Sequence, residues 1–159
     1  MRKTSGFAAL ALIAFFAIGA AARTSTPIDG RPWFDSDDAC FASDNHGIIY
    51  NTCTTKKTFR IGGHVDSSGT KTVNMHGRGN GGTADPTTCT IISTNSNGVI
   101  VGSALVSTTS STMTQLAPFD LTVFVPANGQ LYAHCELAPQ IARTSGTWSG
   151  GLASFRYTP

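Results

Sequence analysis

The chain of 159 residues carries a formal net charge of +2, and charged side chains make up only 13% of it. This length fits one domain with a sizeable hydrophobic core. The low charge, without any basic block or stripe, argues against nucleic acid and anionic membrane surfaces as partners. Thr, Ser, Gly and Asn are abundant instead, which is typical of β structure because Thr favours strands while Gly and Asn favour turns.

The N-terminus has the three parts of a secretory signal peptide. Arg2 and Lys3 give a positive start, an apolar run covers Phe7–Ile18, and small residues ending at Ala22 precede a polar segment. We therefore predict a signal peptide over the first 22 residues, cleaved after Ala22. The apolar run is shorter than the roughly 20 residues that a spanning helix needs. We expect no integral membrane segment in the mature chain, residues 23–159, and a protein that is secreted or periplasmic.

The mature chain shows no convincing helical period, and short strand-like runs separated by turn residues recur along it. The predicted strands are Gly47–Asn51, Lys57–Val65, Lys71–His76, Thr88–Ser93, Val99–Val106, Met113–Leu116, Phe119–Val125, Gln130–Leu137 and Leu152–Thr158. This pattern predicts an all-β fold, a single-domain antiparallel β-sandwich of jelly-roll or immunoglobulin-like type over residues 23–159.

The segment before the first predicted strand carries two aromatic residues and an acidic cluster. We expect Trp33 and Phe34 to cap one open end of the sandwich, with an exposed ligand platform as the alternative. The acidic residues Asp35, Asp37 and Asp38 follow directly. We interpret them as a solvated turn, with one structural calcium ion as the alternative.

Two histidines suggest a possible metal site. If Lys57–Val65 and Lys71–His76 form a hairpin, His64 and His76 point outward on the same face, about 7–8 Å apart on a diagonal. Two imidazoles at that distance could approach one metal ion, but no third ligand is evident. A small metal-dependent hydrolase or metal-binding protein using His64 and His76 is therefore an alternative, and our expectation is that the protein holds no metal and no cofactor.

The remaining turns also make predictions about pairing. Asn97-Gly98 and Asn128-Gly129 can each supply the positive φ angles of a tight turn, so each predicts a hairpin between the strands on either side. The glycine-rich segment Gly77–Gly82 lacks the strand–loop–helix context of a phosphate cradle. It is expected to be a flexible connection between the two sheets.

The four cysteines, Cys40, Cys53, Cys89 and Cys135, all lie in the mature chain. An even number in an oxidising compartment predicts two disulfides, and no C-x-x-C pair indicates a metal site. Three connectivities are possible. Strand alternation turns Cys89 and Cys135 toward the core with aliphatic neighbours, so we predict Cys89–Cys135, with Cys40–Cys53 as the second pair.

Catalytic signals are weak. Glu136 is the single glutamate of the chain, no G-x-S-x-G motif occurs, and no nucleophile, base and orienting acid stand out. The sequence names no catalytic residue, and we predict that the protein is not an enzyme.

Several segments together resemble a known group. They are Cys40-Phe41, Cys89, the run Leu131–Pro139 with its C-x-L-x-P spacing, and the final Ser154–Tyr157. The chain is similar here to a group of small exported bacterial β-rich proteins with spaced cysteines. The resemblance implies a β-sandwich and carries over no activity and no functional residue.

These observations favour an exported, disulfide-stabilised β-sandwich with a non-catalytic binding or structural role at the cell surface or outside it. Its expected partner is a glycan or a surface protein, and the sequence assigns no ligand-binding residue. The main alternative is a carbohydrate-binding module. Such a module needs a row of exposed aromatic side chains, for which the sequence offers Trp33, Phe34, Tyr50, Trp148 and Tyr157.

Overall fold

A computed structural model of the chain describes residues 22–63, 65–144 and 146–158. The predicted signal peptide up to residue 21 and the predicted ligand His64 lie outside the described residues. Within the described part, no helix is long and apolar enough to cross a membrane.

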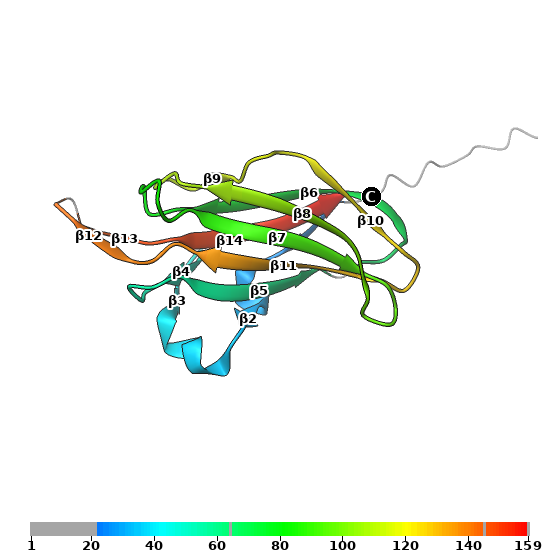
Figure 1. The fold of residues 1–159 in the computed structure, drawn as a ribbon, viewed down its shortest axis with the longest axis horizontal. Helices are drawn as coiled ribbons and strands as arrows, with labels where there is room; N and C mark the ends of the chain where they lie inside the picture. Colours follow the sequence, from blue (N-terminus) through cyan, green and yellow to red (C-terminus); the bar gives the residue numbers. More distant parts are fainter. Residues whose placement is uncertain (1–21, 64, 145, 159) are drawn as a thin grey trace, which may run out of the picture.

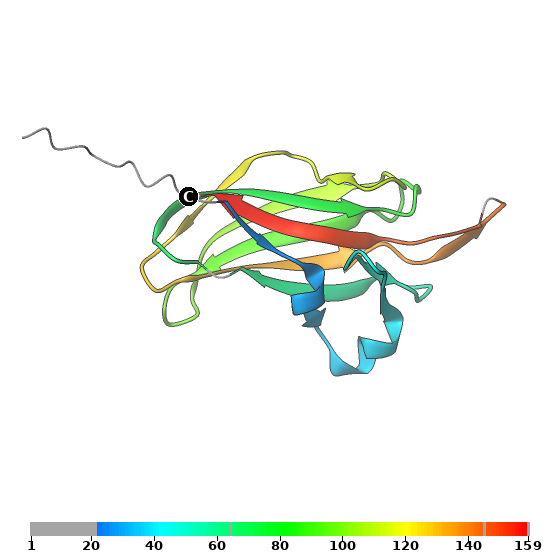
Figure 2. The same cartoon turned by 180° about the vertical axis from the view of Figure 1, so that it is seen from behind.

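Two antiparallel sheets pack face to face, which confirms the predicted sandwich (Figure 1). The seven-stranded sheet contains β1 (Arg23–Ser25), β3 (Phe41–Ser43), β4 (Ile49–Asn51), β6 (Gly69–Arg78), β9 (Thr114–Gln115), β10 (Leu121–Val125) and β14 (Gly151–Thr158). Its main order is β10-β6-β14-β4-β3, with β1 beside β14 and β9 beside β6. Figure 2 shows this sheet from behind, with β14 in red beside β6 and β1.

The second sheet has the order β2-β5-β11-β7-β8. Its strands are β2 (Arg31–Pro32), β5 (Lys57–Gly63), β7 (Thr87–Thr94), β8 (Ile100–Thr108) and β11 (Gln130–Leu137). Outside the two sheets lie the two-stranded ribbon of β12 (Ile141–Arg143) and β13 (Gly146–Trp148), and the 3-10 helices η1 (Pro27–Asp29) and η2 (Asp35–Cys40).

Alternation along the strands builds the core. On β11, Leu131, Ala133, Cys135 and Leu137 are each at most 1% exposed, while the residues between them face outward. On the opposite sheet, Phe155 of β14 is fully buried in the same cluster. Burying each large aliphatic or aromatic side chain stabilises the fold by about 1.5–3 kcal/mol. Because these residues must face the core, the residues that alternate with them must face solvent.

All predicted strands are present, and their ends shift by no more than two residues. The turn at Asn97-Gly98 forms the predicted hairpin, since Gly98 has φ of 78° and β7 pairs with β8. The segment after β6 connects the two sheets as expected, although Gly77 and Arg78, which we predicted to lie in this connection, belong to β6 itself. It is held by backbone bonds, because the N–H of Gly79 donates to the carbonyl of Ser110 at 2.6 Å and that of Gly81 to Thr109 at 3.0 Å.

Two predicted hairpins are wrong. β5 pairs with β2 and β11, whereas β6 lies in the other sheet, so the expected face shared by His64 and His76 does not form. Likewise β10 pairs with β6 and β11 pairs with β5 and β7, although Asn128 does adopt a positive φ of 57°. The physical reason is the same in both cases. Two successive strands bury the same alternating residues whether they pair within one sheet or lie in two sheets that face each other across the core. Alternation therefore does not distinguish a hairpin from a crossing between sheets.

The two disulfides join the cysteines as predicted. Cys89 and Cys135 face each other on adjacent strands β7 and β11, so this bridge lies within one sheet and is fully buried. Cys40 and Cys53 close a loop with a separation of 13 residues, and the other pair spans 46 residues. Loops of these lengths are worth about 3–4 kcal/mol each in the chain-entropy account.

Candidate functional site

The outward face of the five-stranded sheet carries the candidate site. Residues that alternate with the core on β5, β11, β7 and β8 point to solvent. Strand register arranges them in two rows, which are Thr58, Glu136, Thr88 and Ser107, then Arg60, His134, Thr90 and Leu105. Hydroxyl groups and single charged or heterocyclic side chains therefore dominate the centre of this face.

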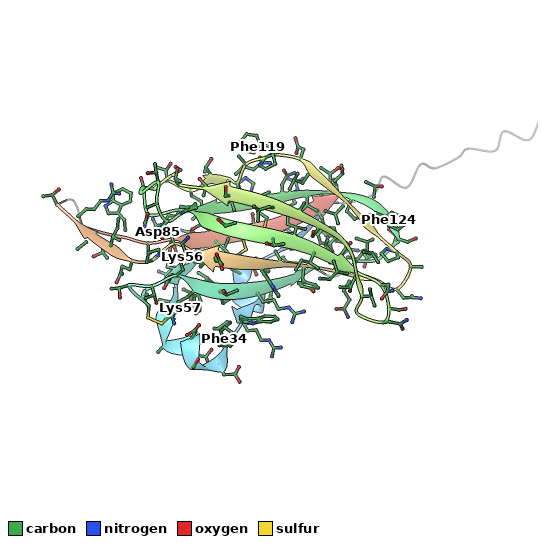
Figure 3. The ribbon with its side chains drawn as sticks, viewed as in Figure 1. Phe34, Lys56, Lys57, Asp85, Phe119 and Phe124 are labelled. Carbon is green, nitrogen blue, oxygen red and sulfur yellow. A yellow bond between two sulfur atoms is a disulfide. The ribbon has the colours of Figure 1, made fainter. Side chains whose placement is uncertain are left out.

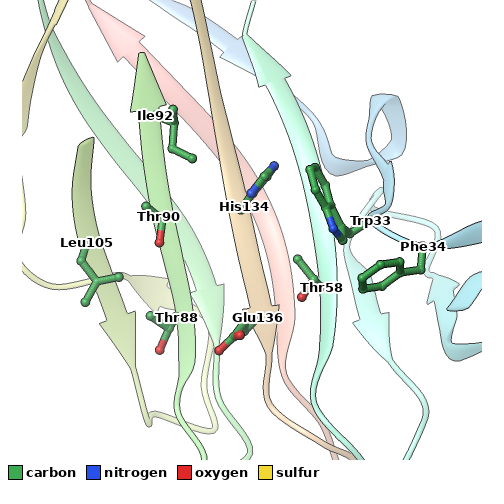
Figure 4. Close-up of a pocket in the computed structure, with 9 residues that line it drawn as sticks. All are labelled: Trp33, Phe34, Thr58, Thr88, Thr90, Ile92, Leu105, His134 and Glu136. Carbon is green, nitrogen blue, oxygen red and sulfur yellow. The ribbon is translucent and has the colours of Figure 1, made fainter. Parts of the chain in front are cut away.

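A groove with a volume of about 540 Å³ lies over these rows (Figure 4). It is lined by Trp33, Phe34, Thr58, Thr88, Thr90, Ile92, Leu105, His134 and Glu136. In Figure 4 the two aromatic rings form one wall and Leu105 stands on the opposite side, with threonines and Glu136 between them. We call this feature the outer groove.

The aromatic wall is fastened to the sheet by the segment that follows β2. The backbone N–H of Trp33 donates to the carbonyl of Thr58 at 2.9 Å, which places the indole over the sheet. Its ring centroid lies 4.3 Å from the His134 imidazole and 6.4 Å from the Phe34 ring. Trp33 is 45% exposed and Phe34 59% exposed. The expectation that these rings cap an open end of the sandwich is therefore wrong, because they cover part of a sheet face and leave much of their surface to solvent.

Arg60 and Tyr132 continue the aromatic wall along the face. The guanidinium carbon of Arg60 lies 4.4 Å from the Tyr132 ring centroid and 5.7 Å from that of Trp33. The Tyr132 ring is in turn 5.3 Å from the imidazole of His134. Cation–π contacts of this kind are worth about 0.5–1 kcal/mol each at exposed sites, so they favour this position of the guanidinium without fixing it.

His134 lies between these groups and is neutral near pH 7. Burial lowers the pKa of its imidazole, and the positive charge of Arg60 lowers that pKa further. Its Nε2 atom is buried and has no hydrogen-bond partner among the described residues. Neither Glu136 nor any other described carboxylate forms a hydrogen bond with this ring, whose contacts are with the rings of Trp33 and Tyr132.

The other predicted residues lie elsewhere. On β6, His76 has its Nδ1 3.3 Å from the Ser154 hydroxyl, and among residues 22–63, 65–144 and 146–158 no three metal-ligating side chains cluster. In η2, Asp37 accepts a bond of 2.7 Å from Lys57. Asp35 and Asp38 are exposed.

The predicted aromatic row does not form as a whole. Tyr157 is only 4% exposed in the core. On the other sheet, Tyr50 stacks under the Arg78 guanidinium at 4.5 Å and donates its hydroxyl to Asp44 at 2.6 Å. Trp148 belongs to the β12–β13 ribbon. Trp33 and Phe34 alone share one surface.

Sequence reasoning missed the floor of the outer groove. Thr88, Thr90 and Glu136 occupy outward positions that alternation alone identifies. Their meeting depends on β11 lying between β5 and β7, and these three strands are far apart in sequence. Local patterns carry no signal for that order.

Comparison with solved structures supports the architecture. Neither a protein-family profile nor a curated protein matches the chain in sequence. The isomalto-dextranase of Arthrobacter globiformis T6, solved with panose, superposes with a TM-score of 0.51 at 12% identity over 86% of this chain, which spans only 23% of that enzyme.

Two separately solved domains give weaker superpositions. One is a family 35 carbohydrate-binding module from Clostridium thermocellum, with a TM-score of 0.48 and 16% identity over 87% of this chain and 98% of the module. The other is the CBM36-1 domain of a xylanase from the hindgut metagenome of Trinervitermes trinervoides, with a TM-score of 0.48 and 10% identity over 86% and 96%. The two packed antiparallel sheets themselves define the class as a β-sandwich, and identities this low carry no role over to this chain.

Proposed function

We propose that the protein is a non-catalytic glycan-binding β-sandwich that holds a sugar chain in the outer groove. The observation that carries this proposal is the juxtaposition, in one groove of about 540 Å³, of exposed aromatic rings with a floor of hydroxyls and one carboxylate. A sugar ring has an apolar C–H face and a rim of hydroxyls. Trp33 and Phe34 match the first, and Thr58, Thr88 and Glu136 can donate to or accept from the second.

The shape of the site favours binding over catalysis. The groove lies open on a sheet face, and its described lining contains one carboxylate and one neutral imidazole without a bond between them. General acid–base hydrolysis of a glycosidic bond needs two facing carboxyl groups. The groove therefore supplies contact area and hydrogen bonds but lacks that second carboxyl group.

The expected location agrees with this role. Two disulfides fit a protein that works in an oxidising compartment, and the predicted signal peptide would deliver it there. We infer that the protein acts outside the cytoplasm, either in a periplasm or at and beyond the cell surface. Membership in the group of exported bacterial proteins that it resembles stays a prediction.

A polysaccharide retention assay tests the proposal. The full chain is expressed with its own leader, and the exported product is run through native gels containing neutral or acidic polysaccharides. We expect retardation by at least one polysaccharide, and its loss in Phe34→Ala.

The matched control is Phe119→Ala. Phe34 and Phe119 are equally exposed at 59%, and Figure 3 shows them on opposite sides of the molecule. Equal loss in both variants, or no retardation by any member of a broad panel, would overturn the proposal.

A further inference from the structure

Two arginines stand directly opposite each other beside the outer groove. Arg31 of β2 is the register partner of Arg60 of β5. Side chains at such positions have Cβ atoms about 4.5–5.5 Å apart, and like charges there destabilise a sheet. The sheet therefore carries a concentrated positive charge next to its aromatic wall.

Neither arginine of this pair is engaged in an ion pair with a described residue. No described carboxylate forms an ion pair with either guanidinium. Asp29 also lines the hollow beside them, where its Oδ2 accepts the Thr26 hydroxyl at 2.9 Å, so two guanidinium groups share this hollow with a single carboxylate. Arg60 instead lies against the rings of Trp33 and Tyr132, and such ring contacts do not use the in-plane N–H donors with which a guanidinium binds an anion.

Open space surrounds the Arg60 side chain. A hollow of about 520 Å³ on the Tyr132 side and another of about 330 Å³ on the Arg31 side are both lined by Arg60 and Gly62. Gly62 contributes to this space, since a Cβ atom built on it would meet no atom within 4 Å. Arg60 thus stands where these two hollows meet, and its contact with Trp33 links them to the outer groove.

We propose that the bound glycan is acidic, and that Arg60 and Arg31 bind its carboxylate or sulfate groups while the sugar ring lies against Trp33 and Phe34. This inference rests on the proposed glycan-binding function and names its substrate class. A guanidinium presents a planar fork that matches either anion with two parallel bonds. An anion between the two arginines would also remove their mutual repulsion.

Paired polysaccharides that differ only in charge test this inference. The exported protein is titrated with polygalacturonate and its carboxyl-reduced form, and with dextran sulfate and dextran, so the carboxylate and sulfate sources are separated. We expect binding to at least one acidic member to be about tenfold or more tighter than to its neutral partner. That preference should weaken between about 50 mM and about 500 mM NaCl.

Single substitutions identify the residues responsible for the preference for acidic polysaccharides. Arg31→Gln and Arg60→Gln should each abolish it, whereas Arg60→Lys keeps the charge without the fork and should restore it only in part. Arg156→Gln removes one charge from an exposed position on β14 of the other sheet and should change nothing.

Each outcome decides between the two proposals. Equal binding of acidic and neutral members, lost in Phe34→Ala, overturns the acidic preference and leaves glycan binding intact. An acidic preference that survives both glutamine variants, or that Arg156→Gln also removes, overturns the assignment to Arg31 and Arg60. Absence of binding to every polysaccharide overturns both proposals.

Discussion

Trp33 packs edge-on against His134, with ring centroids 4.3 Å apart and an angle of 62° between the ring planes. The contact joins the N-terminal segment to the central strand of the five-stranded sheet. It buries the imidazole on one side and shapes the wall of the outer groove on the other. The same indole therefore contributes both to the burial of His134 and to the surface offered to a ligand.

Removing the Trp33 indole should expose the His134 imidazole to water. In Trp33→Ala the imidazole gains access to water, so its pKa should rise toward the ordinary value for histidine, with a stability loss of about 1–2 kcal/mol from the half-buried ring. Histidine resonances followed by NMR through a pH titration measure this pKa directly. An unchanged His134 pKa would mean that burial by Trp33 is not its cause.

The lowered pKa of His134 predicts a pH-dependent stability. The unfolded state binds more protons than the folded state between the folded pKa and the unfolded value of about 6.5, so stability rises with pH through that window. Stability should therefore be complete above about pH 6.5 and fall as the pH drops toward the folded pKa. Urea unfolding should show a smaller fall in His134→Gln, and His76→Gln serves as the control. Equal falls in wild type and His134→Gln would contradict the account.

The fold prediction succeeded where the signal was local and failed where it was not. Alternation located the strands and turned Cys89 and Cys135 toward the same core, so their pairing followed. Asn97-Gly98 and Asn128-Gly129 have the same turn chemistry, yet only the first closes a hairpin. The choice between pairing and crossing depends on which distant strand, here β6 or β11, competes for the edge of β10.

The site prediction was limited for the same reason. Trp33 and Phe34 could be named as a possible ligand platform from their aromatic character. Their companions Thr90, His134 and Glu136 come together through long-range register, which a single sequence does not reveal.

The two disulfides should differ in their resistance to reduction. Cys89 and Cys135 are 0% exposed within the sheet, whereas Cys53 is only partly buried. Under native conditions a thiol reductant should open Cys40–Cys53 first, and paired alanine replacement of Cys89 and Cys135 should cost about 2–5 kcal/mol of stability. Alkylation followed by peptide mass mapping gives the order of reduction. Earlier labelling of Cys89 than of Cys53 would contradict the burial argument.

The Asn51 side chain should contribute strongly to the stability of the fold. Its buried Nδ2 donates to the carbonyls of Thr55 and Leu137 at 2.8 and 3.1 Å, and its Oδ1 accepts the N–H of Cys53 at 2.9 Å. Asn51→Ala leaves the buried carbonyl of Leu137 and the half-buried N–H of Cys53 without this partner, at about 1–3 kcal/mol for each buried group left unsatisfied. Thermal and urea unfolding measure the loss, with exposed Asn45→Ala as the control. A loss no larger than that of Asn45→Ala would show that water replaces the amide.

The central claim is that a glycan binds in the outer groove, and the two tryptophans of the chain provide its most direct test. Each gives one indole N–H signal by NMR, Trp33 from the groove wall and Trp148 from the β12–β13 ribbon. On titration with a retained oligosaccharide, the account predicts a saturable shift of the Trp33 signal and none of the Trp148 signal. A shift of the Trp148 signal alone, or an unchanged Trp33 signal when the protein is saturated with the oligosaccharide, would contradict it.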